Sequence, residues 1–291
     1  MVGWLVFCQY SGPLGPYPRQ KAVIQAVALK NWKIKLHLPD SFDWEKHFFK
    51  THATLKTPKQ RLETTFNLCY QRFAVGTHTH KPHLKNCCRC NSAFMGDNIK
   101  HAFADCPKLA PFWKEVQHIC SSHSFLQQAP IAYPNSPLTL DMMRDIVANR
   151  LFGINRSTGR LGNPTWIVIH TEAIRVLYEQ FWEDMHPRHR ANPNWEYRPE
   201  CAMRRLKRAI QNRCLVDHRH LKEAVATLEV TKFKMKDVPT PEGMDEHPIV
   251  MQKQAEVEHL AETFCSTWVT TAFVTRATTD HILGVPMHLE V

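Results

Sequence analysis

Residues 80–116 have the sequence HKPHLKNCCRCNSAFMGDNIKHAFADCPKLAPFWKEV, in which Cys and His are spaced as C-x2-C-x10-H-x4-C. Two Cys separated by two residues can turn both sulfur atoms onto one metal ion. A His and a Cys five positions apart can supply two further ligands. Tetrahedral zinc binds four such groups, and a site with all four positions filled is structural. The spacing therefore predicts one structural zinc ion held by Cys87, Cys90, His101 and Cys106.

Other Cys and His residues crowd this stretch and leave alternatives. Cys88 could replace Cys87 as a ligand, but C-x-C pairs are rarer at zinc sites than C-x2-C pairs, so we expect Cys88 to stay outside the site. His78, His80 and His83 could offer a fifth ligand or a second site, but we expect them to lie in a solvated loop. The alternative to a metal site is that the Cys residues are ordinary thiols, which the downstream H-x4-C spacing makes less favourable.

The composition of the 291-residue chain is that of a globular protein, with 43% apolar and 22% charged residues. Ten Cys without a recognisable secretory signal indicate a reducing compartment, so we expect an intracellular protein, nuclear or cytoplasmic. No apolar run approaches 18 residues, so no membrane association is expected. Only 10 Gly against 19 Pro weakens any fold that depends on a glycine-rich dinucleotide loop.

Helical periodicity dominates the rest of the chain and predicts a mainly α protein, in which helical bundle-like segments surround an irregular zinc-knuckle insert. The clearest start is Asn163 followed by Pro164, which resembles a helix cap and first turn. The predicted helices are 18–34, 42–53, 57–76, 108–122, 139–150, 163–185, 199–230 and 249–268.

The same patterns divide the chain into four segments. Residues 1–123 form a helical region that contains the knuckle at 80–116. Residues 124–162 hold a linker and a short helix, and residues 163–230 hold long helices with a basic face. Residues 231–291 comprise a charged, Pro-bearing linker, one helix and a tail.

A family resemblance follows from the stretches KQRLETTFNLCYQRFAVGTHTH, CCRC, HAFADCP and PFWKEV. Residues 44–116 resemble the zinc-binding region that follows the polymerase domain in non-LTR (LINE-type) retrotransposon reverse transcriptases. The positions that match the family pattern are Cys87, Cys90, His101, Phe103, Cys106, Pro107, Phe112 and Trp113. About half of the chain lies outside this resemblance.

The resemblance implies a piece of a transposable element that binds nucleic acid. The chain has no Asp-Asp pair, so it lacks the polymerase motif whose carboxylates hold two catalytic metal ions. No endonuclease, RNase H, G-x-S-x-G, H-E-x-x-H or G-K-[ST] motif is present either. We therefore expect a non-catalytic C-terminal fragment, with no catalytic residues and no enzyme activity.

The charge balance supports a polyanionic partner, since 37 Lys and Arg against 27 Asp and Glu give a net charge of +10. The basic residues gather in the knuckle and in 198–222, which has eight Lys and Arg against two acidic residues. We expect RNA or single-stranded DNA to be bound through phosphate contacts from Arg89, Lys100, Lys108, Arg204, Arg205, Lys207 and Arg208.

Three alternatives remain for this basic surface. It could be an ordinary solvated helix face, or the face of a zinc-stabilised module that binds an acidic protein partner. The chain could also be a decayed relic without a selected function. Phe94, Phe103 or Trp113 could stack on unpaired bases, although a place in the core suits Phe103 and Trp113 better.

Overall fold

The computed structural model describes residues 27–44, 59–70, 86–91, 98–121, 139–156, 160–161, 164–184, 196–269, 274–275 and 288–289. This part of the chain is mainly helical, which confirms the predicted fold class. The predicted helical residues 18–26, 45–53, 57–58 and 71–76, the linker over 124–137, and the upstream His78, His80 and His83 lie outside it.

The helical elements follow a stretch of helix over residues 27–35. They are α3 (Lys59–Cys69), α4 (Asn98–Lys100), a π-helical turn η4 (His101–Asp105), a 3-10 turn η5 (Pro107–Leu109), α5 (Ala110–Ser121), α6 (Leu140–Phe152), α7 (Pro164–Asp184), α9 (Pro199–Met235), α10 (Pro248–Phe264) and a second π-helical turn η6 (Cys265–Val269). Two short antiparallel pairs complete the described part: β1 (Ile154–Asn155) with β2 (Arg160–Leu161), and β3 (Val274–Thr275) with β4 (His288–Leu289).

Local signals explain where α6 begins and ends. The side chain of Thr139 accepts a hydrogen bond from the amide of Met142 at 3.2 Å, which caps the first turn. At the other end Gly153 adopts φ +67°, where a side chain would be strained. A Cβ at Gly153 would also lie 3.3 Å from the indole nitrogen of Trp166.

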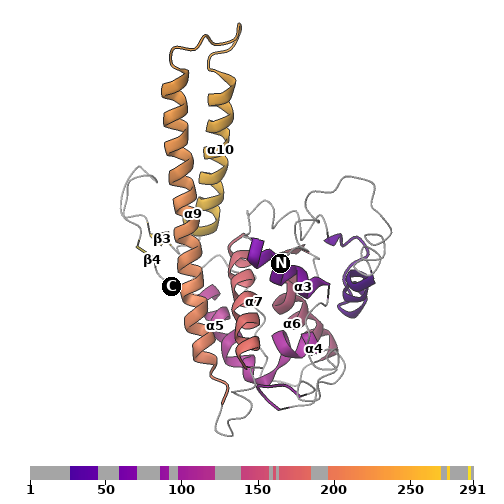
Figure 1. Ribbon diagram of the computed structural model, residues 1–291. Coiled ribbons are helices and arrows are strands. Elements are labelled where there is room, and N and C mark those ends of the chain that lie inside the picture. The colour runs from indigo at the N-terminus through magenta and orange to yellow at the C-terminus, as the bar shows by residue number, and fades with distance from the viewer. Residues whose placement is uncertain are drawn as a thin grey trace, which may run out of the picture.

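The helix predicted over 199–230 is longer than expected, because α9 continues to Met235. Leu221 and Leu228 are buried two helical turns apart and continue the packed side of α9 almost to the predicted end of the helix. The connection to α10 is correspondingly short, at 236–247. Figure 1 shows the result: α9 runs the height of the molecule, beside α5 and α7 over one half and beside α10 alone over the other.

One predicted helix start was wrong, and the last predicted helix changes its hydrogen-bond pattern before its end. Phe42 lies in a turn, with its amide bonded to the carbonyl of Pro39 at 2.9 Å, and helical conformation starts only at Trp44. The C-terminal helix predicted to reach residue 268 ends as an α-helix at Phe264 and finishes as a π-helical turn. There Trp268 is fully buried and its indole N–H donates to Asp217 of α9 at 3.1 Å. The wider turn thus brings the end of the hairpin back onto α9.

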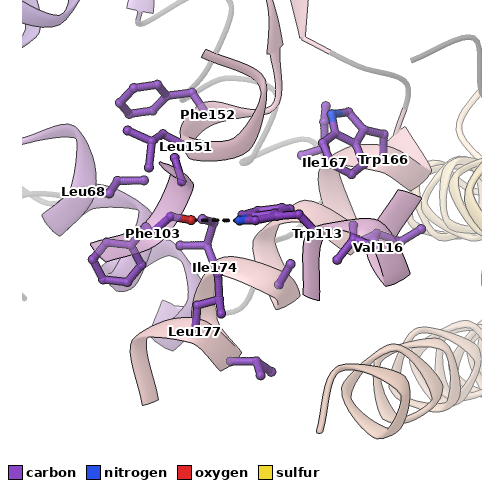
Figure 2. Packing of buried hydrophobic residues seen from close by; sticks show 14 of the residues in the cluster. Leu68, Phe103, Trp113, Val116, Leu151, Phe152, Trp166, Ile167, Ile174 and Leu177 are labelled. Atoms are coloured by element: carbon purple, nitrogen blue, oxygen red, sulfur yellow. Dashed lines mark hydrogen bonds between the residues drawn. The ribbon is translucent and has the colours of Figure 1, made fainter. Parts of the chain in front are cut away.

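One hydrophobic cluster includes buried residues from all four predicted segments, among them Phe103, Leu151, Trp166 and Trp268. Figure 2 shows its centre, where Phe103 and Trp113 lie close to Leu68 of α3, Leu151 of α6 and Ile174 of α7. The residues around the predicted knuckle therefore form part of the main core. None of the helices in the described ranges has the length and apolar character that crossing a membrane requires.

Candidate metal centre and basic helix

The first two predicted ligands lie on a tight turn. Residues 88–90 form the turn, and the amide of Asn91 donates to the carbonyl of Cys87 at 2.9 Å. Asn91 has φ +59°, a left-handed conformation that Asn tolerates better than most residues. The amide of Arg89 points at the Cys87 sulfur at 3.4 Å. This turn places both sulfurs on one side and gives the Cys87 sulfur a backbone donor.

The other two predicted ligands come together through the π-helical turn η4. Residues five apart on an α-helix are separated by about 140° around the axis, so His101 and Cys106 would point in different directions. In the π-turn the amide of Cys106 bonds the carbonyl of His101 at 3.1 Å, which stacks the two residues over each other. Pro107 then keeps Cys106 out of the α conformation, with ψ 126°, and ends the turn. The H-x4-C spacing thus requires this rare helical form.

The four side chains converge on one point. Their ligand atoms all lie within 4.8 Å of one another, so that the group could hold a metal ion. The sulfurs of Cys87 and Cys106 are 3.8 Å apart, and the Cys90 sulfur is 3.2 Å from Nε2 of His101. Two sulfurs bound at about 2.3 Å to one tetrahedral ion are separated by about 3.8 Å, so the spacing suits zinc. Cys88 lies outside this group.

Proximity also changes the acidity of these groups in the metal-free protein. Hydrogen bonds from the Cys106 and Cys88 thiols lower the pKa of Cys87 far below its usual range. The pKa of Cys106 is raised because its hydrogen is shared with Cys87, and burial adds to this effect. The hydrogen bond to Cys87 raises the pKa of His101 to about 9. At neutral pH, His101 is thus protonated beside a Cys87 thiolate.

Metal binding should therefore depend steeply on pH. A metal ion must displace protons at least from His101 and Cys106, because only their deprotonated forms are ligands. The logarithm of the zinc association constant is expected to rise by about two or more per pH unit between pH 6 and 8. Competition with a chromophoric chelator at three pH values measures this slope. A slope near zero would contradict the ligand set.

A carboxylate lies behind the imidazole. Nδ1 of His101 is 3.6 Å from Asp105, while Nε2 faces the sulfurs. Such a carboxylate orients a ligand histidine and increases its basicity. Lys100 forms an ion pair with the same carboxylate at 3.2 Å.

Three side chains attach η4 to the rest of the protein. A single π-turn leaves its carbonyl groups without helical partners, and three consecutive ones are satisfied from outside. Ala102 accepts from Arg89 at 2.6 Å, Phe103 from the indole of Trp113 at 3.0 Å, and Ala104 from Arg150 at 2.9 Å. The donors come from the Cys turn, α5 and α6. The ligand segment is thereby held rigidly against the core.

The prediction that Arg89 contacts phosphate is contradicted by its position. Its side chain is fully buried, and Nε donates to Asp184 at the end of α7 at 2.9 Å. A second nitrogen reaches the carbonyl of Leu177 at 3.3 Å, and the guanidinium lies 5.1 Å from the ring centre of Tyr197. Because every face of Arg89 is occupied, it connects the Cys turn to α7 and cannot reach a ligand in solvent.

The other predicted phosphate contacts differ in how freely they face solvent. Arg205 forms an ion pair with Glu183 of α7 at 2.8 Å, and Lys207 with Glu115 of α5 at 3.1 Å. Lys108 lies 3.8 Å from Glu196 at an exposed site. Arg204 and Arg208 are exposed, and Arg204 donates to the sulfur of Cys201 at 3.6 Å.

Two further cations share the outer face of α9 with Arg204 and Arg208. Arg219 and Lys222 are exposed and lie a whole number of turns further along the helix. Neither residue was singled out from the sequence, although both belong to the basic stretch 198–222. Projecting that stretch onto a helix, and separating the cations by face, would have identified them.

Of the three aromatic residues that could stack on bases, Phe103 and Trp113 belong to the core, and Phe94 lies outside the described residues. Phe103 is 0% exposed and Trp113 is 1% exposed. Their rings are therefore unavailable to bases. In comparisons with known proteins, no family model, no curated protein and no solved structure matches this chain.

Proposed function

We propose that the protein is a non-catalytic nucleic-acid-binding protein whose fold is stabilised by one structural zinc ion. The ion would be held by Cys87, Cys90, His101 and Cys106. In keeping with the sequence resemblance, we further propose that the chain is a C-terminal fragment of a LINE-type reverse transcriptase, and that RNA or DNA is its partner.

The donor set supports zinc in particular. Three thiolates and one imidazole are soft or borderline ligands, which favour zinc over magnesium or calcium. With four protein ligands in a tetrahedral set, no position remains for a reactive water, and the ion would act structurally.

The single observation that carries nucleic-acid binding is the outer face of α9. Four cations, Arg204, Arg208, Arg219 and Lys222, are exposed there and have no acidic partner within ion-pair distance in the described part of the chain. The cations of α9 that face the body are already neutralised by Glu183, Glu115 and Asp217. The open cations can therefore bind phosphates without breaking structural contacts.

Neutralising Arg204 and Arg208 together should weaken oligonucleotide binding. In R204Q/R208Q two phosphate contacts are lost, so affinity at 0.1 M salt is expected to fall roughly tenfold or more. The slope of log affinity against log salt should become less steep by about two. Fluorescence anisotropy with a labelled oligonucleotide measures both quantities.

The matched control removes the same charge from the inward cations of α9. Because Arg205 and Lys207 are paired to Glu183 and Glu115, R205Q/K207Q should leave the salt slope close to wild type. Equal losses in the two variants would show that net charge alone, and not the outer face, governs binding.

The distal part of α9 favours a second candidate, a zinc-stabilised protein-interaction module. Val230 is 53% exposed and Phe233 is 80% exposed on the half of α9 that only α10 accompanies. An apolar interface with a protein would be nearly insensitive to salt, whereas phosphate binding weakens steeply. Salt dependence thus separates the two functions.

A further inference from the structure

We propose that the outer face of α9 binds the backbone of a nucleic-acid duplex in preference to an unpaired strand. This inference rests on the proposed function and names the ligand of the same surface. It is carried by the spacing of the open cations, by their freedom from ion pairs in the described part of the chain, and by the absence of Phe, Trp and Tyr from residues 198–222.

The outer face of α9 is a continuous stripe of six exposed residues. Along the sequence, each is three or four positions from the next, at intervals of four, four, three, four and three. The stripe consists of Arg204, Arg208, Asn212, Leu215, Arg219 and Lys222. At 100° per residue these positions fall within about 80° of the helix circumference, and the span from first to last is about 27 Å. Beyond Lys222 the stripe continues with Ala226 and Val230, which are apolar, so the charged footprint ends there.

No carboxylate lies on this stripe. The nearest exposed acidic residues of α9, Glu200 and Glu223, flank it on opposite sides of the helix. The buried side of α9 includes Leu206, Ile210 and Cys214, so the stripe faces away from α5 and α7. Four positive charges therefore face solvent along one straight edge of the molecule.

The stretch of α9 that holds these four cations has no aromatic ring that could stack on bases. Residues 198–222 contain no Phe, Trp or Tyr, and Tyr197 is buried. Trp182 on the neighbouring α7 is 42% exposed, and its ring packs edge-on against Tyr178 and Phe181 at centre distances of 6.1 and 6.0 Å. Phe233 lies eleven positions past Lys222, about 17 Å further along the axis.

A surface of this kind favours a duplex for electrostatic reasons. Proteins that hold unpaired strands gain about 1–3 kcal/mol from each base stacked on an aromatic ring, and that gain is not available here. Binding must then come from phosphates alone. A duplex carries one phosphate charge per about 1.7 Å of its axis, whereas one strand carries one per about 3.4 Å. A length of about 27 Å therefore holds twice as many phosphates in a duplex as in a single strand. The footprint corresponds to about eight base pairs.

The test measures binding of the full zinc-loaded chain to a labelled 16-base-pair mixed-sequence DNA duplex and to a 16-residue oligo(dT), at 50–200 mM KCl. Four phosphate contacts predict a salt slope of about −3.6 for the duplex, which equals a loss of about 150-fold across this range. At 50 mM KCl the duplex is expected to bind roughly tenfold tighter than the single strand. A matching RNA duplex shows which helical form is preferred.

Variants assign the binding to the stripe. R219Q/K222Q removes two cations of the stripe. For the duplex, the slope of log affinity against log salt should then fall to about −1.8. The matched control K232Q/K234Q removes the same charge from the distal end of α9, outside the footprint, and should leave the slope unchanged. All four side chains are exposed, so neither variant should unfold the protein.

The outcomes separate this inference from the function on which it rests. Equal or tighter binding of oligo(dT) would overturn the duplex preference and leave nucleic-acid binding intact. Unchanged duplex binding by R219Q/K222Q would place the ligand on another face and also overturn the inference. No binding to either oligonucleotide would reject the proposed function itself. Displacement of the duplex by polyglutamate at equal charge would indicate an acidic protein partner instead.

Discussion

Replacing Cys106 with Ser is expected to reduce the zinc content of the purified protein from about one ion per chain to nearly none. Cys106 is fully buried 3.8 Å from the Cys87 sulfur, and a serine hydroxyl is not deprotonated at neutral pH to replace the lost thiolate. Structural zinc contributes folding free energy directly, so the melting temperature should fall by roughly 10 °C or more. Metal analysis by mass spectrometry, with a melting curve on the same sample, measures both effects.

Cys88→Ser is the matched control for this experiment. It makes the same chemical change one residue from a predicted ligand, but Cys88 lies outside the group of four. Zinc content should therefore stay at one ion per chain. A large loss of zinc in Cys88→Ser would show that Cys88, and not Cys87, is the metal ligand. Wild-type protein that contains no metal, and whose melting is unaffected by a chelator, would support the decayed relic instead.

Asp184→Asn should be the most destabilising change outside the metal centre. The change keeps the shape of the side chain but leaves the guanidinium of Arg89, which is fully buried, without a counter-charge. An unpaired buried charge costs about 3–5 kcal/mol, although the intact pair itself contributes little net stability. Urea unfolding monitored by circular dichroism would show this loss as a lower midpoint. The dependence of the unfolding free energy on urea concentration should stay unchanged.

The neighbouring residue provides the control for Asp184. Glu183→Gln breaks the exposed ion pair with Arg205, in which both side chains are more than two-fifths accessible, and should cost at most about 1 kcal/mol. Combining Asp184→Leu with Arg89→Met removes both buried charges and should recover part of the stability lost in Asp184→Asn. Recovery should stay incomplete because Arg89 also donates to Ala102 and Leu177. Equal destabilisation by Asp184→Asn and Glu183→Gln would contradict the buried-charge explanation.

Local sequence signals predicted much of this fold. Asn163 and Pro164 indicated the start of α7, and the observed helix, Pro164–Asp184, ends one residue before the predicted boundary. Helix α6 begins after the cap at Thr139 and ends before Gly153, and both ends lie within two residues of the predicted 139–150. These signals are local because helix caps depend on neighbours along the chain. The spacing of the four Cys and His residues is also a local signal, because all four lie within 20 residues of sequence.

What the sequence did not predict depends on contacts between distant segments. Arg89 looked like a surface cation within a basic knuckle, because its partner Asp184 is 95 residues away and no pattern links the two. Arg205 and Lys207 appeared equivalent to Arg204 and Arg208 until α5 and α7 supplied carboxylates to one side of α9 only. The π-turn at His101 was also unforeseen, since a sequence spacing alone does not specify which helical hydrogen bond is formed.

The separation of these contacts along the chain has a consequence for the order of folding. The sulfurs of Cys87 and Cys106 are 19 residues apart, whereas Arg89 and Asp184 are 95 apart. Closing the longer loop costs about 1.4 kcal/mol more in chain entropy than closing the shorter one. An ion captured by the four ligands would therefore organise the knuckle early, while the carbonyl of Ala104, whose donor Arg150 is 46 residues away, still lacks its partner. The arrival of α6 and α7 would then complete the core around a segment that is already rigid.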